Sequence, residues 1–154
     1  MRLQSAMLAD AARVAENKLY VFGGQWDRIY TNAFPASHAA LTVVLVIEVS
    51  YSEALTDHHL RVALMRDGAA VGPEARGLIN VGHAPGTTPG APSYVPIALP
   101  FAGVLFERPG RYEWVVSLND EPVGSIPLEV AVAPGGVIEE PAEGSSGPMD
   151  PFNN

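Results

Sequence analysis

Side chains that alternate between apolar and polar with a period of two constrain the fold of this chain more than any other feature. The segments 111–118, RYEWVVSL, and 124–132, GSIPLEVAV, each place four apolar side chains on one face. This period is the signature of a β-strand, because successive side chains of a strand point to opposite faces of a sheet. The turn-rich connector NDEPVG joins the two segments, so the sequence predicts an antiparallel hairpin. Its expected inward residues are Tyr112, Trp114, Val116, Leu118, Ile126, Leu128, Val130 and Val132.

Three upstream segments predict further strands. Segment 41–49, LTVVLVIEV, is apolar on both faces, which is typical of a central strand covered on each side, or of a core strand with one face at an interface. Segment 60–68, LRVALMRDG, alternates and then reaches an Asp-Gly turn. Segment 93–101, SYVPIALPF, carries Pro96 and Pro100, and proline cannot donate a ladder hydrogen bond. We therefore expect this last segment to be an edge strand.

The whole pattern predicts an all-β fold. Shorter apolar segments near the N-terminus and at 76–82 bring the count to about eight strands, and residues 11–17 leave room for one helical turn at most. We predict an antiparallel β-sandwich of immunoglobulin-like or C2-like type, and 154 residues suffice for one such domain, at 1–132. Residues 133–154 are rich in Gly, Pro, Ser and Glu, which predicts a flexible acidic tail that carries half of the net charge of −8.

Composition excludes several classes of function. A net charge of −8 opposes phosphate binding, so nucleic acid is not an expected partner. The absence of cysteine excludes disulfides and thiolate metal sites, and no apolar run has the length of a membrane span. Because the N-terminus does not resemble a signal peptide, we expect a cytoplasmic protein without contact to a membrane. Only 17% of the residues are charged, which leaves apolar surface for a partner.

The stretch LYVFGGQWDRIY raises the question of whether Trp26, Asp27 and Arg28 form a binding site. The Gly-Gly pair before them permits a bulge or a positive φ angle, so the chain can turn out of its strand. The favoured interpretation is structural, with the indole folded over the open end of the sandwich. As a second interpretation, an exposed tryptophan beside an arginine is a common anchor of protein interfaces. In the tail, Met149 and Phe152 are candidate contacts with a partner's groove, the alternative being an ordinary frayed terminus.

No pattern in the sequence points to catalysis, a metal or a cofactor. The only local cluster of possible ligands is Asp57-His58-His59, and in an extended chain its two rings point to opposite faces. We interpret it as a solvated loop that enters a strand. Neither a G-x-S-x-G elbow nor a phosphate-binding glycine loop is present.

The blocks MLADAARVAENKLYVFGGQWDRI and PGRYEWVVSLNDEPVGSIPLEV, with the step from His58 to Gly68 between them, resemble a known family. It is a family of small bacterial, mainly actinobacterial, proteins that carry a domain of unknown function. The resemblance covers about residues 5–132. It implies a β-rich domain and no catalytic residues.

These observations favour a non-catalytic binding or structural subunit that acts through protein–protein contacts. The two-faced apolarity of residues 19–22 and 41–49 suggests self-association or a place in a larger assembly. An alternative is a small-ligand or carbohydrate-binding module lined by Trp26, Tyr30 and the loop 82–92. A hydrolytic enzyme is the third possibility, and it requires a pocket that joins a histidine to a carboxylate.

Overall fold

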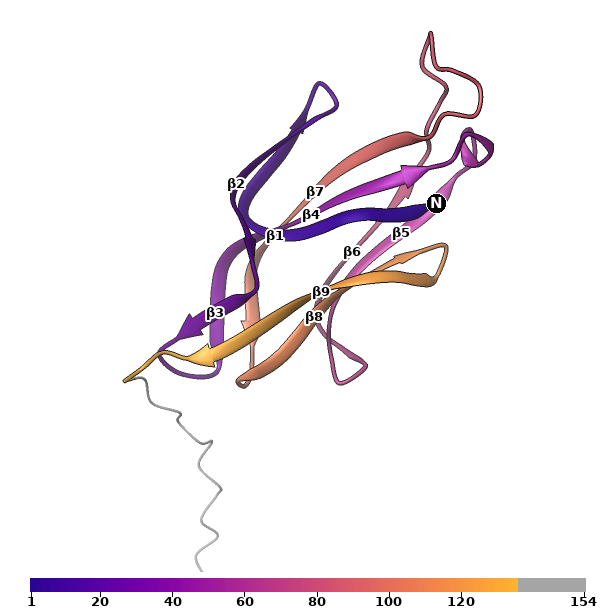
Figure 1. Ribbon diagram of the computed structural model, residues 1–154. Helices are drawn as coiled ribbons and strands as arrows, with labels where there is room; N and C mark the ends of the chain where they lie inside the picture. Colours follow the sequence, from indigo (N-terminus) through magenta and orange to yellow (C-terminus); the bar gives the residue numbers. More distant parts are fainter. Residues whose placement is uncertain (136–154) are drawn as a thin grey trace, which may run out of the picture.

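Two β-sheets pack face to face in the computed structural model of the protein, which describes residues 1–135 (Figure 1). The strands in chain order are β1 (Arg2–Ala15), β2 (Lys18–Trp26), β3 (Arg28–Thr31), β4 (Ala36–Val49), β5 (His58–Arg66), β6 (Ala69–Ile79), β7 (Ser93–Phe106), β8 (Gly110–Leu118) and β9 (Glu121–Val132). One sheet has the order β2-β1-β4-β7, and the other has the order β3-β9-β8-β5-β6. The predicted all-β sandwich is confirmed.

The helical structure in residues 1–135 is a single 3-10 turn, η1 (Tyr51–Glu53). Among these residues no helix is long and apolar enough to cross a membrane.

The core lies between the two sheets and follows the predicted alternation. Strand β4 pairs with β1 on one side and β7 on the other, so it is central as expected. Every second residue of β4 from Leu41 to Val49 is buried in a cluster shared with β5, β8 and β9. Trp114 of β8 is fully buried, and its ring lies 4.5 Å from that of Phe101 on β7. These two rings join the layers near the centre of the sandwich.

The order in which the chain changes layer is that of an immunoglobulin-like sandwich. The chain crosses between the sheets after β2, β3, β4, β6 and β7, and the last three crossings are those of an immunoglobulin-like sandwich. At the last of these crossings, the Tyr112 hydroxyl donates a hydrogen bond of 2.7 Å to the carbonyl of Arg108. A tyrosine at the start of a strand that bonds back to the preceding corner is a hallmark of this fold class. Of the two predicted types, the structure therefore has the immunoglobulin-like one.

The structure differs from the sequence-based expectation in three places. It has nine strands, because the segment after Trp26 forms the short strand β3. Strand β3 pairs in parallel with β9, so the sandwich is not wholly antiparallel. Residues 11–15, where a helical turn was allowed, continue β1, because they pair with β2 over their whole length. Alanine favours a helix in isolation, and strand pairing overrides that preference here.

Candidate interaction surface

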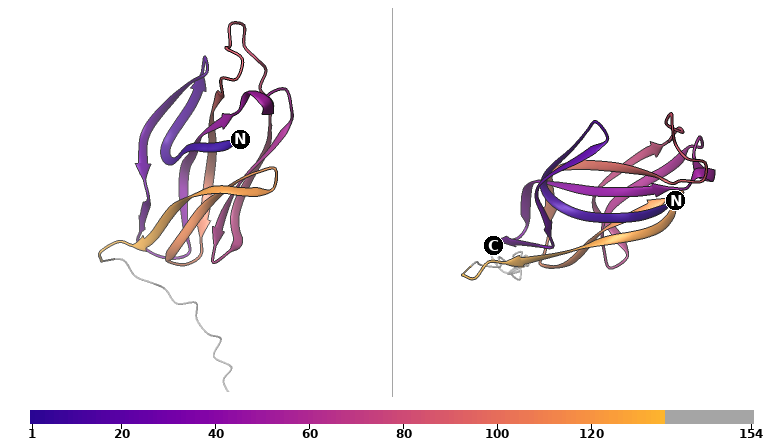
Figure 2. Two further views of the ribbon diagram at one scale, coloured as in Figure 1. Left: turned by 45° about the vertical axis from the view of Figure 1, so that its right-hand side comes forward. Right: turned by 45° about the horizontal axis from the view of Figure 1, so that its top comes forward.

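A β-hairpin projects from the sandwich and forms the most prominent surface feature (Figures 1 and 2). Strand β1 pairs with β4 only as far as Ala9, and beyond that residue it pairs with β2 alone. We call residues 10–23, which have no other strand partner, the hairpin arm. Both β1 and β2 approach β7 although β4 separates β1 from β7 in the sheet, so the hairpin leans across the outer face of its own layer.

Two glycines produce the turn between the hairpin arm and the body. Gly23 has a φ angle of +56°, and a Cβ there would collide with the carboxylate of Asp10. At Gly24 a Cβ would lie 2.8 Å from the Val21 side chain. A residue with a side chain therefore fits neither position without a shift. The pairing of β1 with β2 also slips in register between Leu8 and Ala9, as in a β-bulge. The expected positive φ is confirmed at Gly23, but the chain does not leave its strand there, because β2 continues to Trp26.

Large apolar side chains on the hairpin arm face solvent. Phe22 is 65% exposed, and Tyr20 and Val14 are each 40% exposed. Arg13 lies opposite Tyr20 in the strand pairing, and its guanidinium sits 5.3 Å from the centre of the Tyr20 ring. Such a cation–π contact holds the ring in place on the hairpin surface. The hairpin arm thus presents an aromatic face that the chain itself does not cover.

The other segment with two apolar faces, 41–49, is covered by the protein itself. Val43 and Leu45 face the core, whereas Thr42 and Val44 alternate to the outer side of the sheet. Thr42 and Val44 are nevertheless only 3% and 1% exposed. Both strands of the hairpin approach β7, the neighbour of β4, on this side of the molecule. Of the two segments that suggested an interface, only the one in the hairpin arm is open.

Trp26, Asp27 and Arg28 lie where β2 ends and β3 begins. The Trp26 ring packs against the edge of the core and contacts His38 edge-on, with ring centroids 5.9 Å apart. Its Nε1 is buried and has no hydrogen-bond partner among the described residues. The carbonyl of Asp27 accepts a hydrogen bond of 2.8 Å from the backbone N–H of Glu129. These contacts fix the crossing between the sheets.

Arg28 anchors the short strand β3 to β9. Its guanidinium donates a hydrogen bond of 3.4 Å to the Tyr30 hydroxyl and one of 2.8 Å to the Glu129 carboxylate. Both interactions raise the pKa of Arg28 above its ordinary value, so the side chain is a permanent cation. Its charge is already engaged by a neighbouring strand, which matches the structural interpretation of the Trp-Asp-Arg sequence.

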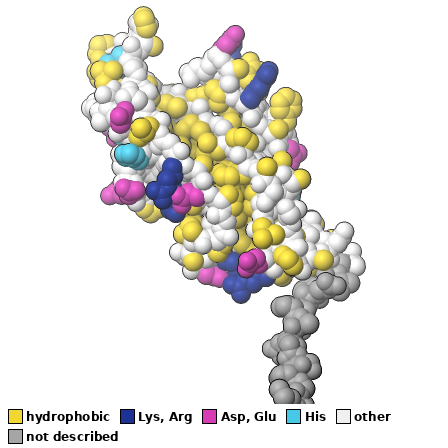
Figure 3. Space-filling model, turned by 180° about the vertical axis from the view of Figure 1, so that it is seen from behind, with side chains coloured by type: hydrophobic (Ala, Val, Ile, Leu, Met, Phe, Trp, Pro, Cys, Tyr) yellow, Lys and Arg dark blue, Asp and Glu magenta, His cyan; other side chains and the backbone are white. Residues whose placement is uncertain are grey.

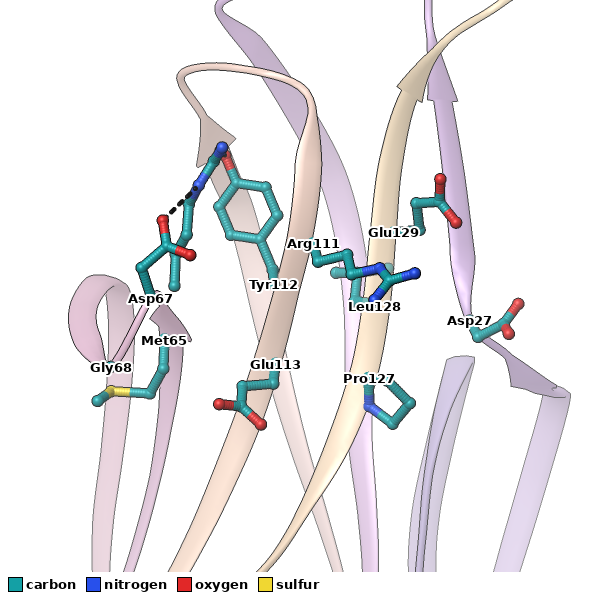
Figure 4. Close-up of a pocket in the computed structure, with 11 residues that line it drawn as sticks. Asp27, Met65, Asp67, Gly68, Arg111, Tyr112, Glu113, Pro127, Leu128 and Glu129 are labelled. Atoms are coloured by element: carbon teal, nitrogen blue, oxygen red, sulfur yellow. Dashed lines mark hydrogen bonds and ion pairs between the residues drawn. The ribbon is translucent and has the colours of Figure 1, made fainter.

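A shallow hollow of about 440 Å³ lies on the outer face of the five-stranded sheet (Figure 4). Its lining comes from the turn after β5 and from β8 and β9, and it includes Asp27, Asp67, Arg111, Glu113 and Glu129. Arg111 points toward the side where Glu129 and Asp27 lie (Figure 4). Within residues 1–135, the side chain of Arg111 forms no hydrogen bond or ion pair. The sequence did not single out Arg111 or Glu113, because each reads as an ordinary outward residue of an alternating strand.

His58 corrects the interpretation of Asp57-His58-His59 as a solvated loop. It is the first residue of β5 and is buried, whereas His59 is exposed, so the two rings do face opposite ways. His58 Nε2 lies 2.8 Å from the carbonyl of Glu53, and its Nδ1 lies 3.1 Å from the amide nitrogen of Asn119. A tautomer with hydrogen on Nε2 satisfies both bonds. The side chain of His58 therefore links the segment between β4 and β5 to the turn between β8 and β9.

The carboxylate of Glu53 lies in the same region and binds the N-terminal ammonium of Met1 and the side chain of Ser50. These two hydrogen bonds, that of the ammonium first, lower the pKa of Glu53 to about 2. The contact ties the beginning of β1 to the 3-10 turn η1.

The residues expected to line a carbohydrate site do not come together. Trp26 and Tyr30 flank a hollow of about 260 Å³ beside β3. The loop 82–92, which joins β6 to β7, lies at the other end of the sandwich (Figure 1). His83 at the beginning of this loop stacks on Tyr51, with ring centroids 4.0 Å apart. The candidate tail residues Met149 and Phe152 lie outside the described residues.

The layer order, the hydrogen bond from Tyr112 to the preceding corner and the projecting hairpin define an immunoglobulin-like β-sandwich with an added β-hairpin arm. The chain belongs to the family of unknown function DUF6941, whose model matches residues 4–131. The resemblance to a family with a domain of unknown function is thereby confirmed, and the hairpin arm lies inside the matched region. No curated protein and no solved structure matched the chain.

Proposed function

We propose that this protein is a non-catalytic binding or structural subunit that acts through protein–protein contacts made by the hairpin arm. The observation that carries this proposal is the exposure of Phe22 and Tyr20 on a hairpin whose base is fixed to the body by Gly23. Aromatic side chains held on a rigid element are frequent anchors of protein interfaces, because burying them removes a large apolar area from water at little entropic cost.

The polar groups of the described residues support a role without catalysis. The buried His58 is engaged by Glu53 and Asn119, which leaves neither ring nitrogen available for proton transfer. Within residues 1–135, no three His, Asp or Glu side chains gather in the way that a metal site requires. A cytoplasmic location, as expected from the sequence, is part of the proposal.

The test compares the full-length protein with F22S and with the control L78S in lysates of the cells that make it. Leu78 lies on β6, in the other sheet, and at 62% its exposure matches that of Phe22. We expect the wild-type protein and L78S to elute in an assembly larger than the 16.3 kDa chain, and F22S to elute at the size of the single chain. Elution of all three proteins as single chains would refute the proposal.

Binding of a small ligand is a second candidate function, favoured by the hollow around Arg111. A guanidinium without a protein partner, beside several carboxylates, can hydrogen-bond to the hydroxyl or carboxylate groups of a sugar. Titration with a panel of neutral and acidic monosaccharides, followed by NMR, tests this candidate. Shifts of the Arg111 side-chain signals that disappear in R111A would support it, and unchanged spectra would exclude these ligands.

A further inference from the structure

The sandwich has four edge strands, and three of them carry features that block pairing with another strand. Strand β7 contains Pro96 and Pro100, whose nitrogens cannot donate hydrogen bonds, and β6 contains Pro73 next to the charged residues Glu74 and Arg76. Strand β3 has only four residues. A band of hydrophobic side chains runs along the side of the molecule seen in Figure 3.

The fourth edge, β2, lacks these protective features. It contains no proline, and its only charged residue is Lys18, at its beginning. Strand β2 is the outermost strand of its sheet (Figure 2), so the edge that faces away from β1 has no strand partner within residues 1–135. An unprotected edge of this kind is a template for a further β-strand.

The geometry of the hairpin turn determines which backbone groups of β2 are free. Glu16 and Asn17 form a two-residue turn with φ angles of 51° and 56°, as in a type I′ hairpin. Ala15 and Lys18 therefore close the turn as a hydrogen-bonded pair, and bonded and non-bonded pairs alternate from there. Consequently, Leu19 and Val21 direct their N–H and C=O groups away from β1, toward solvent.

We infer that the occupant of this edge is a second copy of the chain, paired antiparallel through β2 about a two-fold axis at Tyr20. In this register the free groups of Leu19 face those of Val21 in the other copy, which gives two hydrogen-bonded pairs. Tyr20 then lies opposite Tyr20 of the other copy, and Lys18 lies opposite Phe22. The four-stranded sheets of the two molecules join into one continuous sheet. This inference rests on the proposed function, since it names the partner of the same surface.

Charge favours a second copy as the occupant. Although the chain carries a net charge of −8, the hairpin arm has two acidic residues, Asp10 and Glu16, and two basic residues, Arg13 and Lys18. The contact surface is thus neutral, so two copies meet there without local repulsion between like charges. The central pair is an aromatic pair, which is favourable when it lies directly across two antiparallel strands.

Cysteine cross-linking of the purified full-length protein tests the register. The chain contains no cysteine, so a single Y20C substitution reports on one position. Opposed residues of a non-hydrogen-bonded pair lie at a separation that suits a disulfide. We expect Y20C to form a covalent dimer on mild oxidation and the control L78C to remain monomeric, although Leu78 on β6 is the more exposed of the two, at 62% against 40%. Equal cross-linking of the two variants, or none in Y20C, would overturn the inference.

Charge substitution tests the same contact without a covalent bond. We expect Y20K alone and Y20E alone to dimerise at least tenfold more weakly than the wild-type protein, because like charges then face each other. An equimolar mixture of the two variants should recover the dimer. Sedimentation velocity measures all three samples. A wild-type protein that remains a monomer, while its assembly in lysate still depends on Phe22, would refute the self-pairing and leave the proposed function standing.

Discussion

The outer face of the five-stranded layer and the hairpin arm differ in their ion pairs. The five-stranded layer covers itself with ion pairs, among them Arg28–Glu129 at 2.8 Å and Arg61–Glu74 at 2.5 Å. In the other layer, the hairpin arm exposes Phe22 and Tyr20, and its one ion pair is Lys18–Glu16 at the tip, at 4.0 Å. Although the chain has few charged residues, most of the ion pairs among residues 1–135 lie on the five-stranded layer. The proposed function assigns the charged face to water and the hairpin arm to a protein partner.

The same hydrophobic core supports both outer faces, and the W114A substitution disrupts that core. Removing the fully buried indole leaves a cavity between the layers beside Phe101. We expect a loss of about 3–5 kcal/mol in the free energy of unfolding. Urea denaturation followed by circular dichroism measures it. A loss below about 1 kcal/mol would show that the two layers do not depend on this contact.

G23A separates the hairpin arm from the rest of the molecule. An alanine at position 23 must adopt a φ angle of +56°, and its Cβ would collide with the side chain of Asp10. We expect a destabilisation of about 1–2 kcal/mol together with weaker dimerisation, because the base of the hairpin has to shift. G68A is the matched control, since Gly68 also has a positive φ, of +78°, but has open space around it. If G23A and G68A behave alike, the glycine turn does not orient the hairpin arm.

Y112F acts at the corner between β7 and β8, away from the hairpin arm. The Tyr112 hydroxyl donates to the carbonyl of Arg108 and accepts a hydrogen bond of 3.0 Å from Arg66. Its removal should cost about 1 kcal/mol of stability and leave the self-association unchanged. Thermal unfolding and sedimentation of the same sample measure the two effects. A change in association would mean that the two faces are coupled.

The smallest expected effect is the acid dependence due to Glu53. The pKa of Glu53 in the folded state, about 2, lies below its ordinary value of 4.5. The carboxylate therefore stabilises the fold fully above about pH 4.5, and this contribution is lost as the pH falls toward 2. We expect E53Q to be less stable than the wild-type protein at neutral pH and to lose less stability between pH 4.5 and pH 2. Parallel pH profiles for the two proteins would contradict this assignment.

Local patterns in the sequence predicted the parts of the fold that depend on neighbouring residues. The hairpin of β8 and β9, the central position of β4 and the edge position of β7 follow from alternation and from proline chemistry. The parallel pairing of β3 with β9 joins residues about a hundred positions apart, and no local pattern encodes it. The sequence does not indicate the burial of His58 for the same reason, since its partner Asn119 comes from a distant turn.

The candidate surface was only partly predictable. The apolarity of residues 19–22 suggested an interface, but the same composition is typical of a buried strand. Their exposure depends on the bend of the chain at Gly23 and on the pairing of β1 with β2 alone. The burial of Thr42 and Val44, by contrast, agrees with the expectation of a central strand covered on each side.

Hydrogen exchange at the backbone amides of Leu19 and Val21 tests the central claim most directly. These N–H groups point away from β1 and are free in a monomer, and they are bonded when two β2 edges pair. We predict that their exchange slows as the concentration of the full-length protein rises, while exchange at Lys18 and Tyr20, which bond within the hairpin, changes less. Exchange at Leu19 and Val21 that stays fast at every concentration would contradict the account.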